Sequence, residues 1–263
     1  MILYDMKKLI VFLCVQYFVS FGISQNVLEI PYDATSLTEE QRNANPDYLI
    51  YPAKLEGKDS VEMVCEQVGG DCMEAVDLRL SVKWATCNIG ASSPEEYGDY
   101  FAWGETEQKD VYDWSTYKWC NGSSSTLTKY NNSSSYGTVD NKKTLELADD
   151  AARANWGGAW RMPTDAEMTE LREQCTWTWT TLNGVNGYKV TGTNGNSIFL
   201  PAAGYRYDSS LYPAGIEGFY WSSSLDTGYP FPGYALKVQF HSSDVSWGAT
   251  IRCYGYSVRP VCQ

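Results

Sequence analysis

The clearest pattern of hydrophobic and polar positions lies near the end of the chain, where residues 236–241 alternate between the two. Successive side chains of a strand point to opposite faces of a sheet, so this segment predicts a strand with one face in the core and the other in water. The face assigned to the core carries Leu236, Val238 and Phe240, and the face assigned to solvent carries Lys237, Gln239 and His241.

The alternation resumes after the Ser242-Ser243 pair and then stops. Val245 and Trp247 are predicted to point inward, with Asp244 and Ser246 outward. Residues 248–251 show no clean period and predict a loop. The side chains assigned to solvent are chemically mixed, which favours binding of a partner over catalysis.

Upstream, the pattern predicts short strands around two helices. The second helix is the better marked, because Pro163 precedes it and Thr164 and Glu167 complete a capping box. Helices are expected over 144–155 and 164–175, strands over 76–80, 82–87, 100–104, 176–180, 188–190 and 197–206, and loops over 110–137 and 207–217. This order predicts a single α+β domain with mixed and antiparallel sheets and a β-rich C-terminal third.

The chain begins with a targeting segment, residues 1–24. Lys7 and Lys8 precede an apolar run over 9–21, and small residues precede a cut after Ser24. The run is short for a membrane span, and no other stretch predicts one. We expect a cleaved signal peptide and a protein that is secreted, on the cell surface or in the periplasm.

Residues 25–72 differ in character from residues 73–263. They are polar and acidic, are broken by three prolines, and predict short helices over 38–42 and 60–68. We expect a partly ordered N-terminal extension or an arm for a partner, and then one compact domain over 73–263.

Composition narrows the classes of function. Aromatic residues make up 14% of the 263 residues, with 20 Tyr and 10 Trp, which is typical of a β-rich core and of wet binding surfaces. The formal net charge of −12 argues against nucleic acid as a partner, because phosphate binding needs a basic footprint.

Export to an oxidising compartment would allow the cysteines to form disulfides. Eight cysteines are present, and removal of Cys14 with the targeting segment leaves seven, which predicts disulfides and one odd thiol. Cys65 and Cys72 are close enough in sequence to close a small loop, and the other pairings stay open. A zinc site is disfavoured because no Cys-x-x-Cys occurs and His241 is the only histidine, so we expect no metal or cofactor.

Catalytic residues are not expected. A Ser/His/Asp arrangement would have to use His241, which this interpretation places on an exposed strand face. The acidic pairs at 95–96 and 149–150 are typical of a solvated loop and helix end. Arg161, Arg206 and Arg259 are expected to tie strands together through carbonyl or carboxylate acceptors rather than to bind a ligand.

Four separated motifs, in order, resemble a known family. Residues 160–167 (WRMPTDAE) resemble the start of a helix in the formylglycine-generating branch of the C-type lectin-like fold, and 220–224 and 257–261 resemble its late strands. Residues 76–88 resemble the start of the Fibrobacter succinogenes major paralogous domain, which is common in secreted proteins of gut Bacteroidetes. The resemblance covers residues 73–262 and implies a C-type lectin-like fold.

Within that group, the terminal stretch is similar to the variable region of target proteins of diversity-generating retroelements. Those proteins mutate adenines in their codons and display the variants on a binding surface. An AAC codon mutated at its adenines yields Tyr, His, Asp, Ser, Gly, Ala, Thr, Ile or Cys, but not Lys or Gln. Lys237 and Gln239 therefore need other codons, or this copy is an undiversified paralogue.

These observations predict a secreted, non-enzymatic protein that binds an extracellular protein or glycan. Its aromatic anchors would be Tyr229, Phe231, Tyr254 and Tyr256. The remaining ligand-binding candidates are Lys237, Gln239, His241, Asp244, Ser246, Gly248, Ala249, Thr250, Ile251 and Cys253. The alternatives are a component of a surface fibre or envelope complex, and a formylglycine-generating-type enzyme that would rely on cysteines and copper.

Overall fold

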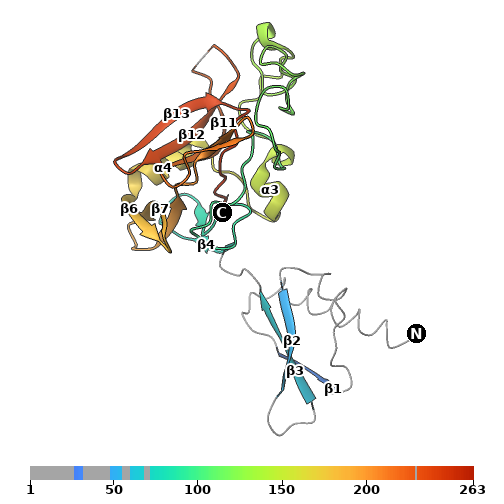
Figure 1. Ribbon diagram of the computed structural model, residues 1–263, viewed down its shortest axis with the longest axis vertical. Helices are drawn as coiled ribbons and strands as arrows, with labels where there is room; N and C mark the ends of the chain where they lie inside the picture. The colour runs from blue at the N-terminus through green and yellow to red at the C-terminus, as the bar shows by residue number, and fades with distance from the viewer. Residues whose placement is uncertain (1–26, 32–47, 55–59, 68–71, 229) are drawn as a thin grey trace, which may run out of the picture. The chain divides into compact units, whose positions relative to one another are not determined.

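The structure is a computed structural model that describes residues 27–31, 48–54, 60–67, 72–228 and 230–263 (Figure 1). The chain divides into two compact units, Met1–Gly70 and Asp71–Gln263. The expected targeting segment, the expected helix over 38–42 and Tyr229 lie outside the described residues. In the part of the chain that the structure describes, no helix is long and apolar enough to cross a membrane.

The first unit contains an antiparallel sheet in the order β1-β3-β2, formed by β1 (Val27–Pro31), β2 (Tyr48–Lys54) and β3 (Ser60–Gln67). The helix expected over 60–68 is therefore wrong. Apolar Val61 and Met63 flank Glu62, a period of two that suits a strand, and pairing with strands on both sides overrides the local helical signal.

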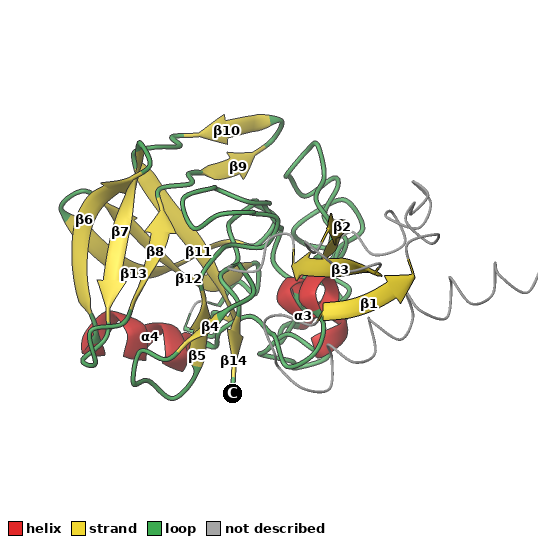
Figure 2. Ribbon diagram, turned by 90° about the horizontal axis from the view of Figure 1, so that it is seen from below, coloured by secondary structure: helices red, strands yellow, loops and turns green. Residues whose placement is uncertain are grey.

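The second unit is mostly β-sheet, in several small antiparallel sheets. One sheet holds β6 (Thr176–Leu182), β7 (Val185–Thr191) and β8 (Ser197–Pro201), and another holds β11 (Glu217–Leu225), β12 (Tyr234–His241) and β13 (Asp244–Ile251). The hairpin of β9 (Tyr205–Tyr207) and β10 (Ser210–Tyr212) stands at the opposite end of the unit from α4 (Figure 2). β4 (Ala75–Val76), β5 (Lys83–Ala85) and β14 (Val261–Cys262) close the unit by pairing its two ends.

Two α-helices are described, α3 (Ala151–Trp156) and α4 (Asp165–Gln174). The capping box of α4 is confirmed, because the Thr164 hydroxyl accepts from the Glu167 N–H and the Glu167 carboxylate accepts from the Thr164 N–H. The first helix is shorter than the expected 144–155, because Asp150 caps its start and residues 147–149 form a separate 3₁₀ turn.

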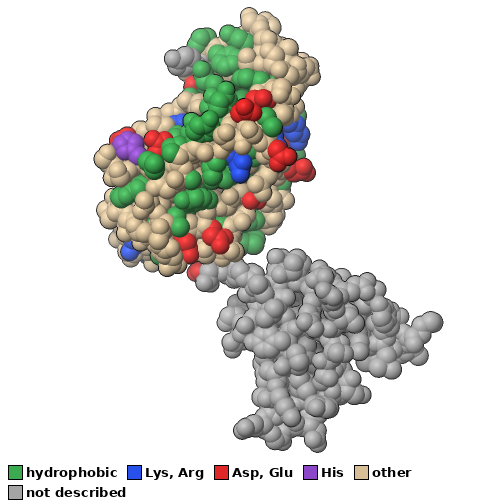
Figure 3. Space-filling view, viewed as in Figure 1, with side chains coloured by type: hydrophobic (Ala, Val, Ile, Leu, Met, Phe, Trp, Pro, Cys, Tyr) green, Lys and Arg blue, Asp and Glu red, His purple; other side chains and the backbone are tan. Residues whose placement is uncertain are grey.

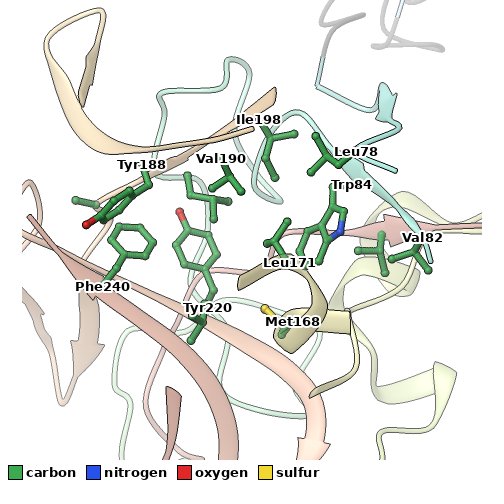
Figure 4. Close-up of a cluster of buried hydrophobic side chains, with 14 residues drawn as sticks. Leu78, Val82, Trp84, Met168, Leu171, Tyr188, Val190, Ile198, Tyr220 and Phe240 are labelled. Atoms are coloured by element: carbon green, nitrogen blue, oxygen red, sulfur yellow. The ribbon is translucent and has the colours of Figure 1, made fainter. Parts of the chain in front are cut away.

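The main core lies between the two largest sheets and α4 (Figure 4). Met168 and Leu171 of α4, Val238 and Phe240 of β12, and Tyr188 of β7 are all buried in it. The ring of Phe240 stacks on Tyr220 and meets the edge of Tyr188, at centroid distances of 5.8 and 5.2 Å. Val238 and Phe240 are therefore core residues, as expected, whereas Leu236 is only half-buried.

The loop expected over 110–137 holds only isolated bridges and one short 3₁₀ turn, η2 (Ser134–Tyr136), and it is not confined to the surface. Tyr112, Tyr117, Leu127 and Tyr130 are buried. The Tyr117 hydroxyl donates to the carbonyl of Trp103 at 2.7 Å. The aromatic residues of this loop therefore build part of the interior.

Four predictions of local structure need correction. Of the strand expected over 76–80, only Val76 lies in a strand, β4, and residues 77–80 lie outside any strand. Residues 100–104 hold only an isolated bridge, Phe101 to Tyr256. Residues 202–206 do not continue β8, because Gly204 turns the chain with φ of 66°. The expected loop over 207–217 contains β10, so 205–212 is a hairpin.

The disulfide joins Cys72 to Cys87, not Cys72 to Cys65. Their Cα atoms lie 4.7 Å apart, within the range that a disulfide requires. Sequence proximity favoured the wrong partner, because the chain folds back over 15 residues to bring Cys87 beside Cys72. Cys120, Cys175, Cys253 and Cys262 are free thiols.

Candidate functional site

The strand register of β11, β12 and β13 assigns nine of the fourteen predicted site residues to one side of the sheet or the other. Lys237 pairs with Gly248 and with Trp221, and Val238 pairs with Trp247 and with Tyr220. We name the two sides the Lys237 face and the Val238 face. The Lys237 face carries Phe219, Gln239, His241, Asp244, Ser246, Gly248 and Thr250.

The Val238 face packs on the main core, and this fixes the direction of the opposite side chains. Gln239, His241, Ser246 and Thr250 are half-buried, and Asp244 is exposed. Figure 3 shows hydrophobic side chains gathered across the visible face of this unit, with the histidine at one edge. The structure therefore brings seven of the fourteen predicted residues onto one face of one sheet.

Lys237 contradicts its expected exposure, because only 5% of it is accessible. The Phe219 ring lies beside it, with Nζ 5.4 Å from the ring centroid, and Nζ donates to the Gln239 side-chain carbonyl. Alternation identifies the face on which a side chain lies but not what covers that face. Here Phe219, on the neighbouring strand, supplies the cover.

Several other predicted residues do not join the site. Gly248–Ile251 belongs to β13 and is not a loop, so Ala249 and Ile251 fall on the Val238 face. Cys253 and Tyr256 are buried, with 1% and 3% of their surfaces exposed. Phe231 packs against Tyr136, at a centroid distance of 5.0 Å.

Tyr256 is buried because a second core lies against one end of the Lys237 face. Its ring stacks on Trp221 with centroids 4.4 Å apart, and its hydroxyl donates to the Thr250 hydroxyl at 3.3 Å. Burial raises the pKa of the Cys253 thiol to about 12. Neither residue presents the side chain that recognition of an external ligand would need.

A group of four tyrosines lies beside this face, and sequence reasoning predicted only Tyr254 among them as a site residue. Tyr205, Tyr207, Tyr212 and Tyr254, which we name the tyrosine cluster, are in ring contact with one another. Tyr207 and Tyr212 are 43% and 42% exposed. Tyr205 also meets the ring of Phe219, at a centroid distance of 4.9 Å, so the tyrosine cluster continues onto the Lys237 face.

Backbone pairing holds the tyrosine cluster in place. Arg206 and Gly255 exchange N–H···O bonds of 2.8 and 2.9 Å, which sets β9 beside Tyr254. A Cβ on Gly255 would lie 2.6 Å from the Tyr112 ring, so this position requires glycine. The sequence signal was the YRYDSSLY stretch over 205–212, where aromatic residues alternate on both sides of a polar turn.

A hollow lies elsewhere, over the side of the β6–β8 sheet that faces away from the main core. It has a volume of about 390 Å³. It is lined by Thr86, Pro94, Thr180, Thr181, Leu182, Lys189, Ser197, Ile198 and Phe199. None of these residues was predicted, and the hollow is the rival location for a ligand.

The arginine predictions can be compared with the structure individually. Arg259 is fully buried and bonds to carbonyl and amide oxygens, and Arg161 forms a two-bond ion pair with Glu167 at 2.8 and 2.5 Å. Arg259 ties strands together as expected, whereas Arg161 binds a carboxylate on helix α4. Arg206 instead lies over the ring of Tyr100, with 5.4 Å between the guanidinium carbon and the ring centroid.

The comparisons with known proteins add nothing to this geometry: no family model, no curated protein and no solved structure matches the chain.

Proposed function

We propose that the chain is a secreted, non-catalytic ligand-binding protein of C-type lectin-like fold. Its site is the Lys237 face together with the tyrosine cluster. The observation that carries the proposal is the continuity of exposed tyrosine rings with a strand face of mixed polar side chains. Tyrosine provides large, rigid contact area at low entropic cost, which is why it dominates natural binding surfaces.

Diversification of this surface is part of the proposal. His241, Asp244, Ser246, Gly248, Thr250 and Tyr254 are all residues that adenine mutation of an AAC codon produces. Five of them lie on the Lys237 face, and Tyr254 lies in the adjoining tyrosine cluster. A flanking reverse transcriptase gene and a template repeat that differs only at adenines are the expected findings in the surrounding DNA. Their absence would leave an undiversified paralogue.

The tyrosine cluster offers a direct test of binding. Replacing Tyr207 and Tyr212 with serine together should abolish binding of the full chain to an array of defined glycans and peptides. These two half-exposed rings supply most of the accessible aromatic area of the cluster. The measurement is the array signal of the double variant against that of the unaltered chain.

Leu211→Ser is the matched control. Leu211 is 43% exposed on the same hairpin, but it pairs with Arg206 and so lies on the opposite side from Tyr205 and Tyr212. It should leave the array signal unchanged. Equal loss in both variants would show that hairpin stability, and not the tyrosine surface, governs binding.

The two alternatives make different predictions. An assembly role predicts that deletion of residues 25–71 removes function, whereas ligand binding should survive it. A copper-dependent modifying enzyme needs a reactive thiolate, but burial raises the pKa of Cys253 and of Cys262. Stoichiometric copper uptake with loss of free thiol would favour the enzyme.

A further inference from the structure

We infer that the Lys237 face holds a carboxylate group of the ligand, in a notch between Lys237, Gln239 and Gly248. This rests on the proposed function and names the chemistry of its ligand. Three observations carry it: the bonding of the Lys237 ammonium, the absence of a side chain at Gly248, and the orientation of the Gln239 amide.

The Lys237 ammonium is buried with too few acceptors. It has three N–H donors, and among the described residues only the Gln239 side-chain carbonyl accepts from it. Glu217 acts on it electrostatically, but no carboxylate of the described residues forms an ion pair with it. A buried ammonium with a single acceptor is unfavourable, so an oxygen supplied from outside would compensate for the missing partners.

The absence of a side chain at Gly248 leaves open space beside the Lys237 ammonium. Gly248 lies directly across from Lys237 in the register and is only half-buried. A Cβ built on Gly248 would be 3.9 Å from Lys237 Nζ and within 4 Å of no other described atom outside its neighbours. The space that a side chain would occupy is therefore open, and an atom placed there is in reach of the ammonium.

Gln239 completes the donor set. Its carbonyl oxygen accepts from Lys237, so its amide nitrogen keeps two N–H donors for another group. An ammonium and an amide side by side match the two oxygens of a carboxylate. A phosphate dianion fits less well, because Lys237 is the one cation that faces this notch among the described residues, and the negative charge of Glu217 already acts on it.

The test uses the full chain with ¹³C at the lysine ε-carbons, and Lys237→Met assigns the Lys237 signal. Sodium benzoate, titrated at constant ionic strength, should shift that signal and reach saturation, whereas benzamide, its neutral analogue, should not. The signal of Lys143, an exposed lysine outside both the Lys237 face and the hollow, is the internal control and should not saturate.

Gly248→Ala is the structural variant. The alanine Cβ meets only an ordinary contact, so the fold should be kept while the notch is filled. Benzoate affinity should fall roughly tenfold, the ratio expected when a charge-assisted hydrogen bond is lost.

Two results would overturn the assignment: an equal response of Lys237 to benzamide, or a Lys237 signal that carboxylates do not move. The array experiment separates this from the proposed function. If the Tyr207→Ser/Tyr212→Ser variant loses array binding while benzoate does not shift the Lys237 signal, the proposed binding surface is supported and the carboxylate assignment is contradicted.

Discussion

Replacing Arg259 with methionine should lower the free energy of unfolding by about 3–5 kcal/mol. The Arg259 guanidinium is fully buried and donates to Asn88 Oδ1 at 2.9 Å, to the carbonyls of Ala85 and Phe199 at 3.0 and 2.8 Å, and to the carbonyl of Thr86. Methionine fills similar volume but leaves these four oxygens without that donor. The cost comes from unpaired buried acceptors.

Denaturation in urea monitored by tryptophan fluorescence measures this effect. All ten tryptophans lie between residues 84 and 247, so the signal reports on the Asp71–Gln263 unit. Arg79→Met is the control, because Arg79 is exposed, and it should change stability by no more than about 0.5 kcal/mol. A loss below about 1 kcal/mol for Arg259→Met would contradict the tying role of Arg259.

Replacing Lys237 with methionine should have the opposite sign. Burial lowers the pKa of Lys237 from its ordinary 10.5 to about 8, with Glu217 opposing. Each pKa unit corresponds to 1.36 kcal/mol, so burial of the ammonium destabilises the folded chain by roughly 3 kcal/mol at pH 7. Methionine removes that cost while keeping the apolar contacts of the side chain, and the variant should be more stable by up to this amount.

The pH dependence fixes the sign of the Lys237 effect. Below about pH 8 both the folded and the unfolded chain carry the proton, and the full cost is present. Between about pH 8 and 10.5 the unfolded chain binds more protons, so the unfolding free energy of the unaltered chain rises with pH. The advantage of Lys237→Met should therefore shrink over this window and vanish above it.

A matched comparison isolates this contribution. Lys189→Met removes an exposed lysine and should give no such pH-dependent difference. The other charged groups on the Lys237 face, Glu217, His241 and Asp244, are the same in the variant and the unaltered chain, so their contributions largely cancel in the difference. If the Lys237→Met variant is less stable than the unaltered chain at pH 7, the Lys237 ammonium has enough hydrogen-bond acceptors in the folded chain and the account is contradicted.

The predictions for Arg259 and Lys237 have opposite signs because the two side chains have different numbers of hydrogen-bond acceptors, although both carry a positive charge. Both side chains are buried cations, and neither has a carboxylate partner among the residues that the structure describes. Arg259 has four oxygen acceptors, whereas Lys237 has one. A buried cation that is poorly bonded lowers stability, and such residues concentrate at functional sites, which is the reason to assign Lys237 a ligand.

Local signals predicted part of the fold. The capping box at Thr164 and Glu167 marked the start of α4, and alternation over 236–241 gave the correct core face of β12. These succeeded because each depends on neighbours within a few residues. The Cys72–Cys87 disulfide was not predicted, because its geometry is set by the path of the chain between the two residues.

The candidate site was predicted less well, since its decisive contacts are non-local. The burial of Lys237 depends on Phe219, 18 positions earlier, and the tyrosine cluster depends on the pairing of Arg206 with Gly255. The alternation in YRYDSSLY was visible, but the polar turn inside it favoured a loop. Ala249, Ile251 and Cys253 were selected by their position in the terminal stretch, and position in the sequence alone does not place a side chain on a face.

The most direct test of the binding surface is a fragment screen on the full chain with ¹³C-labelled tyrosine rings and lysine ε-carbons. If the surface recognises ligands, fragments that bind should move the signals of Tyr207, Tyr212 and Tyr254, with acidic fragments also moving Lys237. Fragments that instead gather in the hollow beside Lys189, and leave the tyrosine signals unmoved, would contradict the account.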